Sequence, residues 1–157
     1  MTTVDREIAR FGLPYIDVLK IDTEGYDPTV LSGAYLALLA HRINVITFEY
    51  NTVWNRVNAT LQQCVRYMDD LGYVCFYDGP RLFKISGTCW DDRYEIKKWT
   101  NIVCVARGSV LELEFLAGTL VFGPRLGRPE PPPRRGWWLK MWQGLGRKKS
   151  SGAKPNA

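Results

Sequence analysis

Hydrophobic positions in the first fifty residues follow strand spacing, then helix spacing, then strand spacing again. Residues 15–22, YIDVLKID, are rich in β-branched and aliphatic side chains and predict a strand. A helix should follow, with Asp27 as its cap and Pro28 in its first turn. Its apolar residues recur at helical spacing at Val30, Leu31, Ala34 and Leu38. Residues 43–49, INVITFE, predict a second buried strand, and a strand, helix, strand unit predicts a parallel sheet covered by helices.

The same alternation continues to about residue 108. Apolar side chains at helical spacing predict a helix over residues 61–71, which ends before Gly72. Two further strands are predicted at residues 73–77 and 101–106, and residues 78–80, Asp-Gly-Pro, predict a turn. Gly33 lies inside the first predicted helix, so we expect close packing of a neighbouring segment there. The pattern is that of an α/β chain.

The pattern changes after Gly108. The run that follows alternates enough for a short hairpin or a poor helix, and the sequence leaves both open. From Gly123 onward prolines and tryptophans accumulate, and the chain ends in a Lys, Ser and Gly-rich segment that is typical of disorder. We therefore predict two parts, a folded part over residues 1–108 and a basic, Pro/Trp-rich tail over residues 109–157.

Charge is divided unevenly between these two parts. The 157 residues carry a net charge of +5. Residues 109–157 hold 9 basic and 3 acidic side chains, whereas residues 1–108 hold 12 and 13. The folded part is thus nearly neutral, and the basic balance gives no information about its ligand.

Cysteine and histidine usage argues against a metal centre. The four cysteines lie 11 to 15 residues apart without a C-x-x-C pair, and the single histidine, His41, lies between the first helix and the second strand, where a loop histidine is expected. The first residues lack the apolar core of a signal peptide, and no apolar run is long enough to span a membrane. These features predict a cytoplasmic protein with four buried or half-buried thiols, which are Cys64, Cys75, Cys89 and Cys104.

Polar residues end the first two predicted strands and form the candidate site. Asp22 and Glu24 have the same parity, so an extended backbone as far as Glu24 would direct both side chains to one side, and Gly25 permits the turn that follows. Glu49 closes the second strand, with Asn51 two residues later. Ligands bind at the carboxyl ends of strands in parallel sheets. Helix capping or solvent exposure is the alternative explanation of these side chains.

These residues carry a family resemblance. The string IDVLKIDTEGYDPTVLSG at residues 16–33, followed by ITFEYN at 46–51, resembles the second half of FkbM-type methyltransferases. In that family an aliphatic strand runs into K-I-D-x-E-G, then a helix with V-L-x-G, then a strand that closes on Glu. Residues 3–5 resemble the T-L-D that precedes this strand, and residues 99–103 resemble the family's closing W-x-N-hydrophobic strand. The resemblance extends over about residues 3–106.

The resemblance implies a Rossmann-like fold, S-adenosylmethionine as cofactor, and methylation of a hydroxyl on a small molecule or glycan. Family members carry the glycine-rich loop and the acidic residue that hold the cofactor upstream of T-L-D. Because this sequence starts almost at that motif, we expect a partial fold, the second half of a mostly parallel sheet, from a truncated or degenerate gene product. Weak or absent cofactor binding should follow, together with aggregation or pairing of the exposed sheet edge with another chain.

The resemblance also suggests roles for the candidate residues. It places Asp22, Glu24 and Glu49 at the catalytic edge of the sheet, where Asp22 and Glu49 would orient the substrate or accept its proton. Lys20 would pair with one of these carboxylates, and Lys20 and Asn51 would contact the substrate. No residue is assigned to the cofactor or to a metal.

The tail offers an alternative function. Its clustered tryptophans and basic residues suit a membrane surface, and less well a single-stranded nucleic acid, while a flexible tail without either role is equally compatible. Three classes therefore remain open, namely a methyltransferase or its fragment, a non-catalytic domain derived from one, and a small adaptor that binds through its tail.

Overall fold

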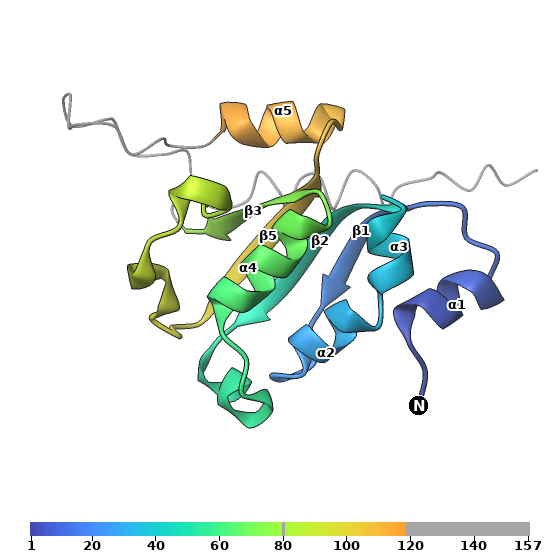
Figure 1. The fold of residues 1–157 in the computed structure, drawn as a ribbon, viewed down its shortest axis with the longest axis horizontal. Coiled ribbons are helices and arrows are strands. Elements are labelled where there is room, and N and C mark those ends of the chain that lie inside the picture. Colours follow the sequence, from blue (N-terminus) through green and yellow to red (C-terminus); the bar gives the residue numbers. More distant parts are fainter. Residues whose placement is uncertain (80, 119–157) are drawn as a thin grey trace, which may run out of the picture. The chain divides into compact units, whose positions relative to one another are not determined.

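The computed structural model describes residues 1–79 and 81–118, all within the first of two compact units, Met1–Leu126. Five strands form one sheet and helices flank it (Figure 1), which confirms the α/β class. The elements are α1 (Val4–Arg10), β1 (Ile16–Ile21), α2 (Asp27–Ser32), α3 (Tyr35–Leu39), β2 (Ile43–Tyr50), η1 (Thr52–Val57), α4 (Leu61–Asp70), β3 (Tyr73–Asp78), β4 (Leu82–Lys84), η2 (Gly87–Cys89), η3 (Asp92–Glu95), β5 (Thr100–Ala106) and α5 (Val110–Ala117). None of the helices in these ranges has the length and hydrophobicity of a membrane-spanning segment.

The strand order is β1-β2-β5-β3-β4. β1 and β2 are parallel, as predicted, with Val18 beside Val45. β5 lies between β2 and β3 and is antiparallel to both, and β4 is antiparallel to β3. The expectation of a mostly parallel sheet is therefore wrong for the described chain, because hydrophobic patterning identifies a strand but not its direction. β1, β2 and β3 still share one direction.

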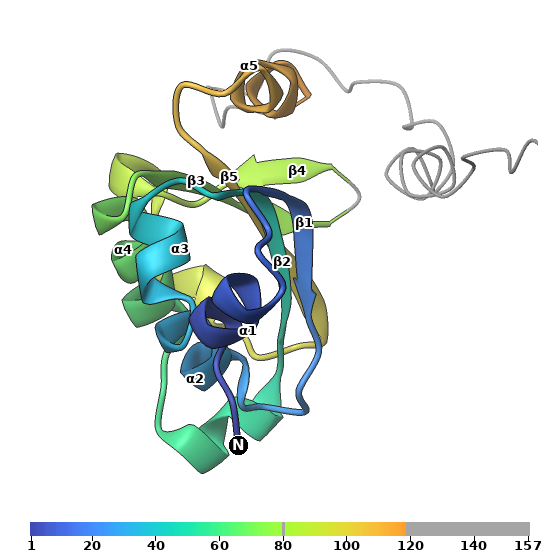
Figure 2. The same cartoon turned by 90° about the vertical axis from the view of Figure 1, so that its right-hand side faces the viewer.

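The two faces of the sheet carry different helices. One face packs under α1 to α4 with Ile46, Phe48 and Ile102 in its core (Figure 2). The other face packs against α5, whose Phe115 contacts a cluster that includes Val45 and Val105. The run after Gly108 is thus a helix as far as residue 117, and its packing continues beyond that glycine. The predicted domain boundary at residue 108 stays a prediction. The segment 119–157, on which the predicted tail functions depend, lies outside the described residues.

The predicted helix after β1 forms as two short helices. α2 ends at Ser32, and α3 begins at Tyr35 because Asp5 accepts hydrogen bonds from the backbone N–H groups of Leu36 and Ala37, both at 2.9 Å. These bonds satisfy N–H groups that a helix start leaves unpaired. At Gly33, between the helices, an added Cβ would lie 3.3 Å from the Thr3 Cβ, which confirms the expected close packing.

β3 and β5 are cross-linked by a disulfide. Cys75 and Cys104 lie directly opposite each other in the antiparallel pair, with 4.0 Å between their Cα atoms, and both are fully buried. The prediction of four thiols is therefore wrong for this pair, because sequence spacing could not show that the two residues meet. Cys64 and Cys89 are free; Cys64 is buried, as predicted, whereas Cys89 is exposed, a correction to the prediction. Burial raises the pKa of the Cys64 thiol to about 12, so the thiol stays protonated near neutral pH.

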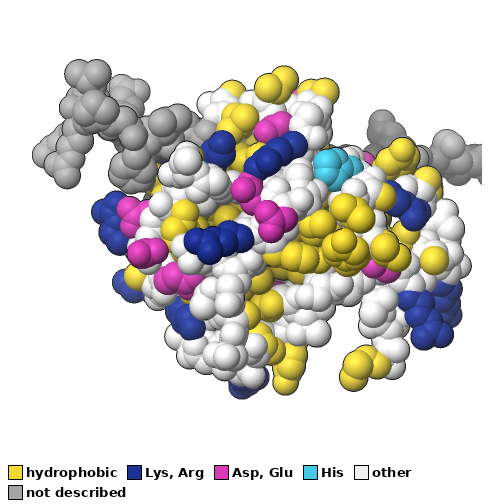
Figure 3. Space-filling model, in the orientation of Figure 1, with side chains coloured by type: hydrophobic (Ala, Val, Ile, Leu, Met, Phe, Trp, Pro, Cys, Tyr) yellow, Lys and Arg dark blue, Asp and Glu magenta, His cyan; other side chains and the backbone are white. Residues whose placement is uncertain are grey.

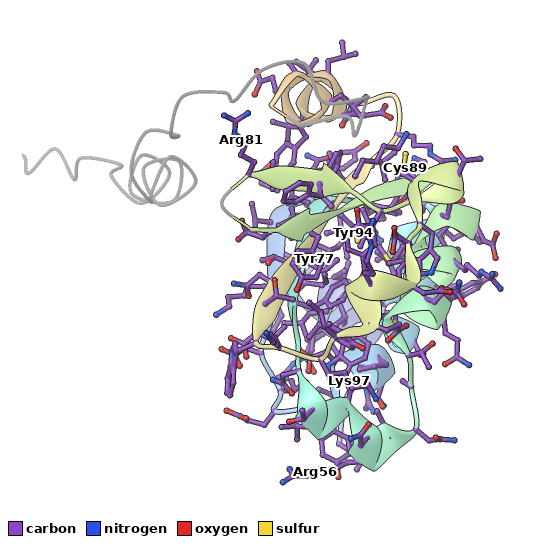
Figure 4. The ribbon with its side chains drawn as sticks, turned by 90° about the vertical axis from the view of Figure 1, so that its left-hand side faces the viewer. Arg56, Tyr77, Arg81, Cys89, Tyr94 and Lys97 are labelled. Carbon is purple, nitrogen blue, oxygen red and sulfur yellow. A yellow bond between two sulfur atoms is a disulfide. The ribbon has the colours of Figure 1, made fainter. Side chains whose placement is uncertain are left out.

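The segment between β4 and β5 folds back over one end of the sheet. Tyr94 of η3 lies beside Tyr77 of β3, with 5.7 Å between ring centroids (Figure 4). Glu95 accepts hydrogen bonds from the Tyr50 hydroxyl and from the Gln62 backbone N–H at the start of α4. These contacts join η3 to β2, β3 and α4 and fix the approach to β5.

Candidate active site

Four polar residues lie side by side across the sheet where β1, β2 and β3 end. Glu49 of β2 is opposite Asn101 of β5, and Asn101 is opposite Asp78 of β3. Asp22 directly follows Ile21, whose partner is Phe48, so Asp22 reaches the level of Glu49. Residues opposite each other in a sheet project from the same face. We call Asp22, Glu49, Asn101 and Asp78 the polar row.

The polar row and α5 occupy opposite ends of the same sheet face. The residues of β2 with the parity of Glu49 include Val45, which packs in the cluster with Phe115 of α5. The arrows of β1 and β2 point away from α5, toward the polar row (Figure 1). Neighbouring strands are about 4.8 Å apart, so the row spans about 14 Å. This end of the face presents carboxylates and an amide instead of apolar side chains.

Lys20 forms an ion pair within this site. Its Nζ lies 3.1 Å from Asp22 Oδ2, and each side chain is about half exposed, at 45% and 46%. The predicted pairing of Lys20 with a carboxylate of the site is confirmed. An exposed pair of this kind adds little to stability. Its effect here is local, because the Lys20 charge also acts on Glu49 and opposes the rise of its pKa.

The surroundings of Glu49 change the pKa of its carboxyl group. Burial raises the pKa of Glu49 above 4.5, and the negative charges of Asp22 and Asp27 act in the same direction. Lys20 and a hydrogen bond to the Trp99 side chain lower it but do not cancel the rise. The indole N–H can only donate, so Glu49 is the acceptor. A carboxylate with a raised pKa is a stronger base, which suits a proton acceptor.

Asp78, Asn101 and Trp99 belong to this site although the sequence analysis did not assign them to it. Asp78 is half-buried, and burial raises the pKa of its carboxyl group. Trp99 is 68% exposed and lies one residue before β5. Asp78 ends its strand as Asp22 and Glu49 do, which was a usable signal, but the Asp-Gly-Pro sequence indicated only a turn. The antiparallel insertion of β5, which brings Asn101 and Trp99 here, has no signal in the sequence.

Glu24 lies in the turn after β1 instead of on an extension of the strand. β1 ends at Ile21, and Glu24 is exposed with a φ of 52°. The condition for Asp22 and Glu24 to leave on one side, an extended backbone as far as Glu24, is therefore not met. Gly25 has a φ of 99°, and an added Cβ would lie 2.8 Å from the Val53 carbonyl oxygen. The turn requires glycine, as predicted.

Two other predicted residues serve the local structure. Asn51 is 3% exposed, and its Oδ1 accepts a hydrogen bond of 2.8 Å from the Val53 backbone N–H at the start of η1. Asp27 is the first residue of α2 and not its cap, a correction to the prediction, because the cap position falls on Tyr26. Asp27 is buried, and its Oδ2 accepts from the Gly25 N–H at 3.3 Å.

His41 and the metal-ligating residue types add no second site to the described chain. His41 is exposed in the loop before β2, and its Nε2 lies 2.9 Å from the Leu71 carbonyl oxygen, which confirms a loop histidine. Over residues 1–79 and 81–118, no three His, Cys, Asp or Glu side chains are grouped so that they could hold a metal ion.

Comparisons with known proteins identify the N-terminal part of the chain. No curated protein and no solved structure matches it. Residues 1–75, from α1 into β3, match the family model of the methyltransferase FkbM domain. The match includes Lys20, Asp22 and Glu49, whereas the resemblance of residues 99–103 stays a prediction. The resemblance to FkbM-type methyltransferases is thus confirmed for residues 1–75, and the N-terminal part of this chain is similar to the methyltransferase FkbM domain.

Proposed function

We propose that the polar row is the acceptor side of a methyl-transfer site and binds a hydroxyl-bearing small molecule or glycan for O-methylation with S-adenosylmethionine. The observation that carries the proposal is the position of Glu49, a carboxylate with a raised pKa at the end of a strand inside the FkbM match. Transfer of a methyl group to a hydroxyl needs a base that removes the hydroxyl proton, and most of the remaining catalysis is orientation.

Each residue of the site has a role in this proposal. Glu49 accepts the hydroxyl proton, and the Asp22–Lys20 pair holds a neighbouring hydroxyl through one acceptor and one donor. Asp78 and Asn101 extend the row across β3 and β5, so a ligand with several hydroxyls along about 14 Å can contact all four strands. The exposed Trp99 ring gives the ligand an apolar surface to lie on.

The described residues do not fit the whole cofactor. S-adenosylmethionine, when bound, supplies the methyl group, and its nucleotide part needs backbone that a ligand can approach closely, usually at glycines. Gly25 is the glycine nearest the row along β1, but Val53 fills the space in front of it. We therefore assign to residues 1–79 and 81–118 only the acceptor side of the site, within a partial Rossmann-like unit.

The test uses the indole N–H signal of Trp99 in NMR spectra of the full chain, assigned with Trp99→Phe. Monosaccharides and linear polyols are titrated in turn. We expect a saturable shift with at least one of them, lost in Glu49→Gln and kept in Glu114→Gln, an exposed control on α5. The proposal fails if no hydroxyl compound shifts the signal, or if Glu49→Gln responds like the wild type.

Calorimetry with S-adenosylmethionine tests whether the described residues form only the acceptor side of the site. We expect weak or no binding to the purified chain, because the described residues offer no cradle for the nucleotide. Tight binding, with a dissociation constant near or below about 1 μM, would contradict that assignment.

A further inference from the structure

Three buried side-chain atoms of the described chain have no hydrogen-bond partner, and all three lie where two loops meet. They are Thr23 Oγ1, Asp27 Oδ1 and Trp54 Nε1. Thr23 and Asp27 belong to the segment that leads from β1 into α2, and Trp54 belongs to η1, which follows β2. Buried polar groups in folded proteins nearly always have a partner, so three such atoms in one region indicate that a further group binds there.

Gly25 joins the two loops. Its N–H donates to Asp27 Oδ2 at 3.3 Å, and an added Cβ at Gly25 would lie 2.8 Å from the Val53 carbonyl oxygen. Trp54 directly follows Val53, and Thr23 and Asp27 are each two residues away from Gly25. The three unpartnered atoms thus come from two loops that contact each other.

Bulk solvent does not reach this junction. Asp27 is 1% exposed and Trp54 is 0% exposed. The Trp54 ring packs against Phe48 and Tyr50 of β2, with 5.8 and 5.0 Å between ring centroids. Figure 3 shows mainly hydrophobic and uncharged surface over α2. Within the described residues, the Asp27 carboxyl group therefore has only the hydrogen bond from Gly25, and a buried carboxylate needs more than one.

The three atoms differ in their hydrogen-bonding character. An indole N–H only donates, an ionised carboxylate only accepts, and a hydroxyl does both. None of the three bonds directly to another, since each is without a partner. A water molecule can accept from Trp54 and donate to Asp27 and Thr23, and three hydrogen bonds are typical of a buried water. An apolar ligand would leave all three atoms unsatisfied.

We propose that Thr23, Asp27 and Trp54 form a binding site for one internal water molecule. The water joins the loop after β1 to the loop after β2. It therefore fixes the strand ends that carry Asp22 and Glu49 of the polar row. The water site does not depend on any ligand of the polar row, so it can be tested without a substrate.

NMR spectra of the full chain test for the water at the Trp54 indole N–H, whose signal is assigned with Trp54→Phe. A water held in the interior gives NOESY and ROESY cross-peaks of opposite sign with the indole proton, whereas chemical exchange of that proton gives cross-peaks of the same sign. We expect opposite signs. The absence of a cross-peak with water, or cross-peaks of the same sign, overturns the proposal.

Thr23→Val tests whether the two loops share the same water. Valine removes the hydroxyl group at nearly constant volume, and Thr29→Val, at an exposed position on α2, is the matched control. Thr23→Val should shift the Trp54 indole signal and weaken its cross-peak with water, although Thr23 and Trp54 share no direct hydrogen bond. Thr29→Val should change neither, and equal behaviour of the two variants contradicts the proposal. The wild-type cross-peaks need no variant, so they test the site even if Thr23→Val does not fold.

Discussion

The disulfide between β3 and β5 predicts a large and specific dependence of stability on the redox state of the chain. Cys75 and Cys104 are 29 residues apart, and a cross-link that closes a loop of this length reduces the entropy of the unfolded chain by about 12 cal/mol/K. At 25 °C this corresponds to about 3.6 kcal/mol of folding free energy. A domain is stabilised by only about 5 to 15 kcal/mol in total, so loss of the bond should be easy to detect.

The perturbation is the double variant Cys75→Ala/Cys104→Ala, and the assay is denaturant unfolding of the full chain without reductant. We expect the unfolding free energy to fall by about 2 to 4 kcal/mol relative to the wild type. The matched control is Cys89→Ala, which removes an exposed free thiol and should change stability by less than about 0.5 kcal/mol. Reductant should destabilise the wild type and leave the double variant unchanged.

Thiol titration identifies the bond independently. The denatured wild type without reductant should expose two thiols, those of Cys64 and Cys89, and four after reduction. Four reactive thiols before reduction would show that the Cys75–Cys104 bond is absent, and a double variant as stable as Cys89→Ala would show that the bond does not stabilise the fold.

Two other predictions concern the site region. Gly25→Ala should destabilise the chain more than Gly12→Ala in denaturant unfolding. Both positions have positive φ, which costs about 1 to 3 kcal/mol for a residue with a side chain, but only at residue 25 does the added Cβ meet the Val53 backbone. Equal losses of unfolding free energy would contradict this explanation of the turn. Asp78→Asn should raise the thermal unfolding temperature at neutral pH, because burial raises the pKa of Asp78 in the folded state. The ionised Asp78 carboxylate destabilises the folded state increasingly as pH rises from 3.8, its ordinary pKa, through its pKa in the folded state. The gain in unfolding temperature should therefore vanish well below pH 3.8, and a gain that is independent of pH would exclude this cause.

The sequence predicted the elements whose signals are local. The alternation and length of residues 43–49, and the helical spacing of residues 61–71, correspond to β2 and α4 within one residue. α4 also begins with a capping box formed by Thr60 and Gln63, a signal contained within four residues. Asp22 and Glu49 were identified as site residues because the hydrophobic pattern locates the strand ends, and both carboxylates lie at such ends.

Features that depend on distant residues were not predictable in this way. The break between α2 and α3 depends on Asp5, more than thirty residues away from the N–H groups that it satisfies. The direction of β5 depends on the three-dimensional path of the chain. Its antiparallel position between β2 and β3 places Cys104 opposite Cys75, and it also brings Asn101 and Trp99 to the site. β4 has only three residues, too few for a clear alternation.

In the proposed function, Glu49 is a proton acceptor whose pKa is raised by burial and by Asp22. NMR titration of the Glu49 side-chain carboxyl carbon, in the wild type and in Asp22→Asn, tests it most directly. We expect a wild-type pKa of Glu49 above 4.5 and a lower pKa in Asp22→Asn, because that variant removes a negative charge that disfavours ionisation of Glu49. A wild-type pKa at or below 4.5, or a pKa that does not respond to Asp22→Asn, would exclude this role of Asp22 and of burial at Glu49.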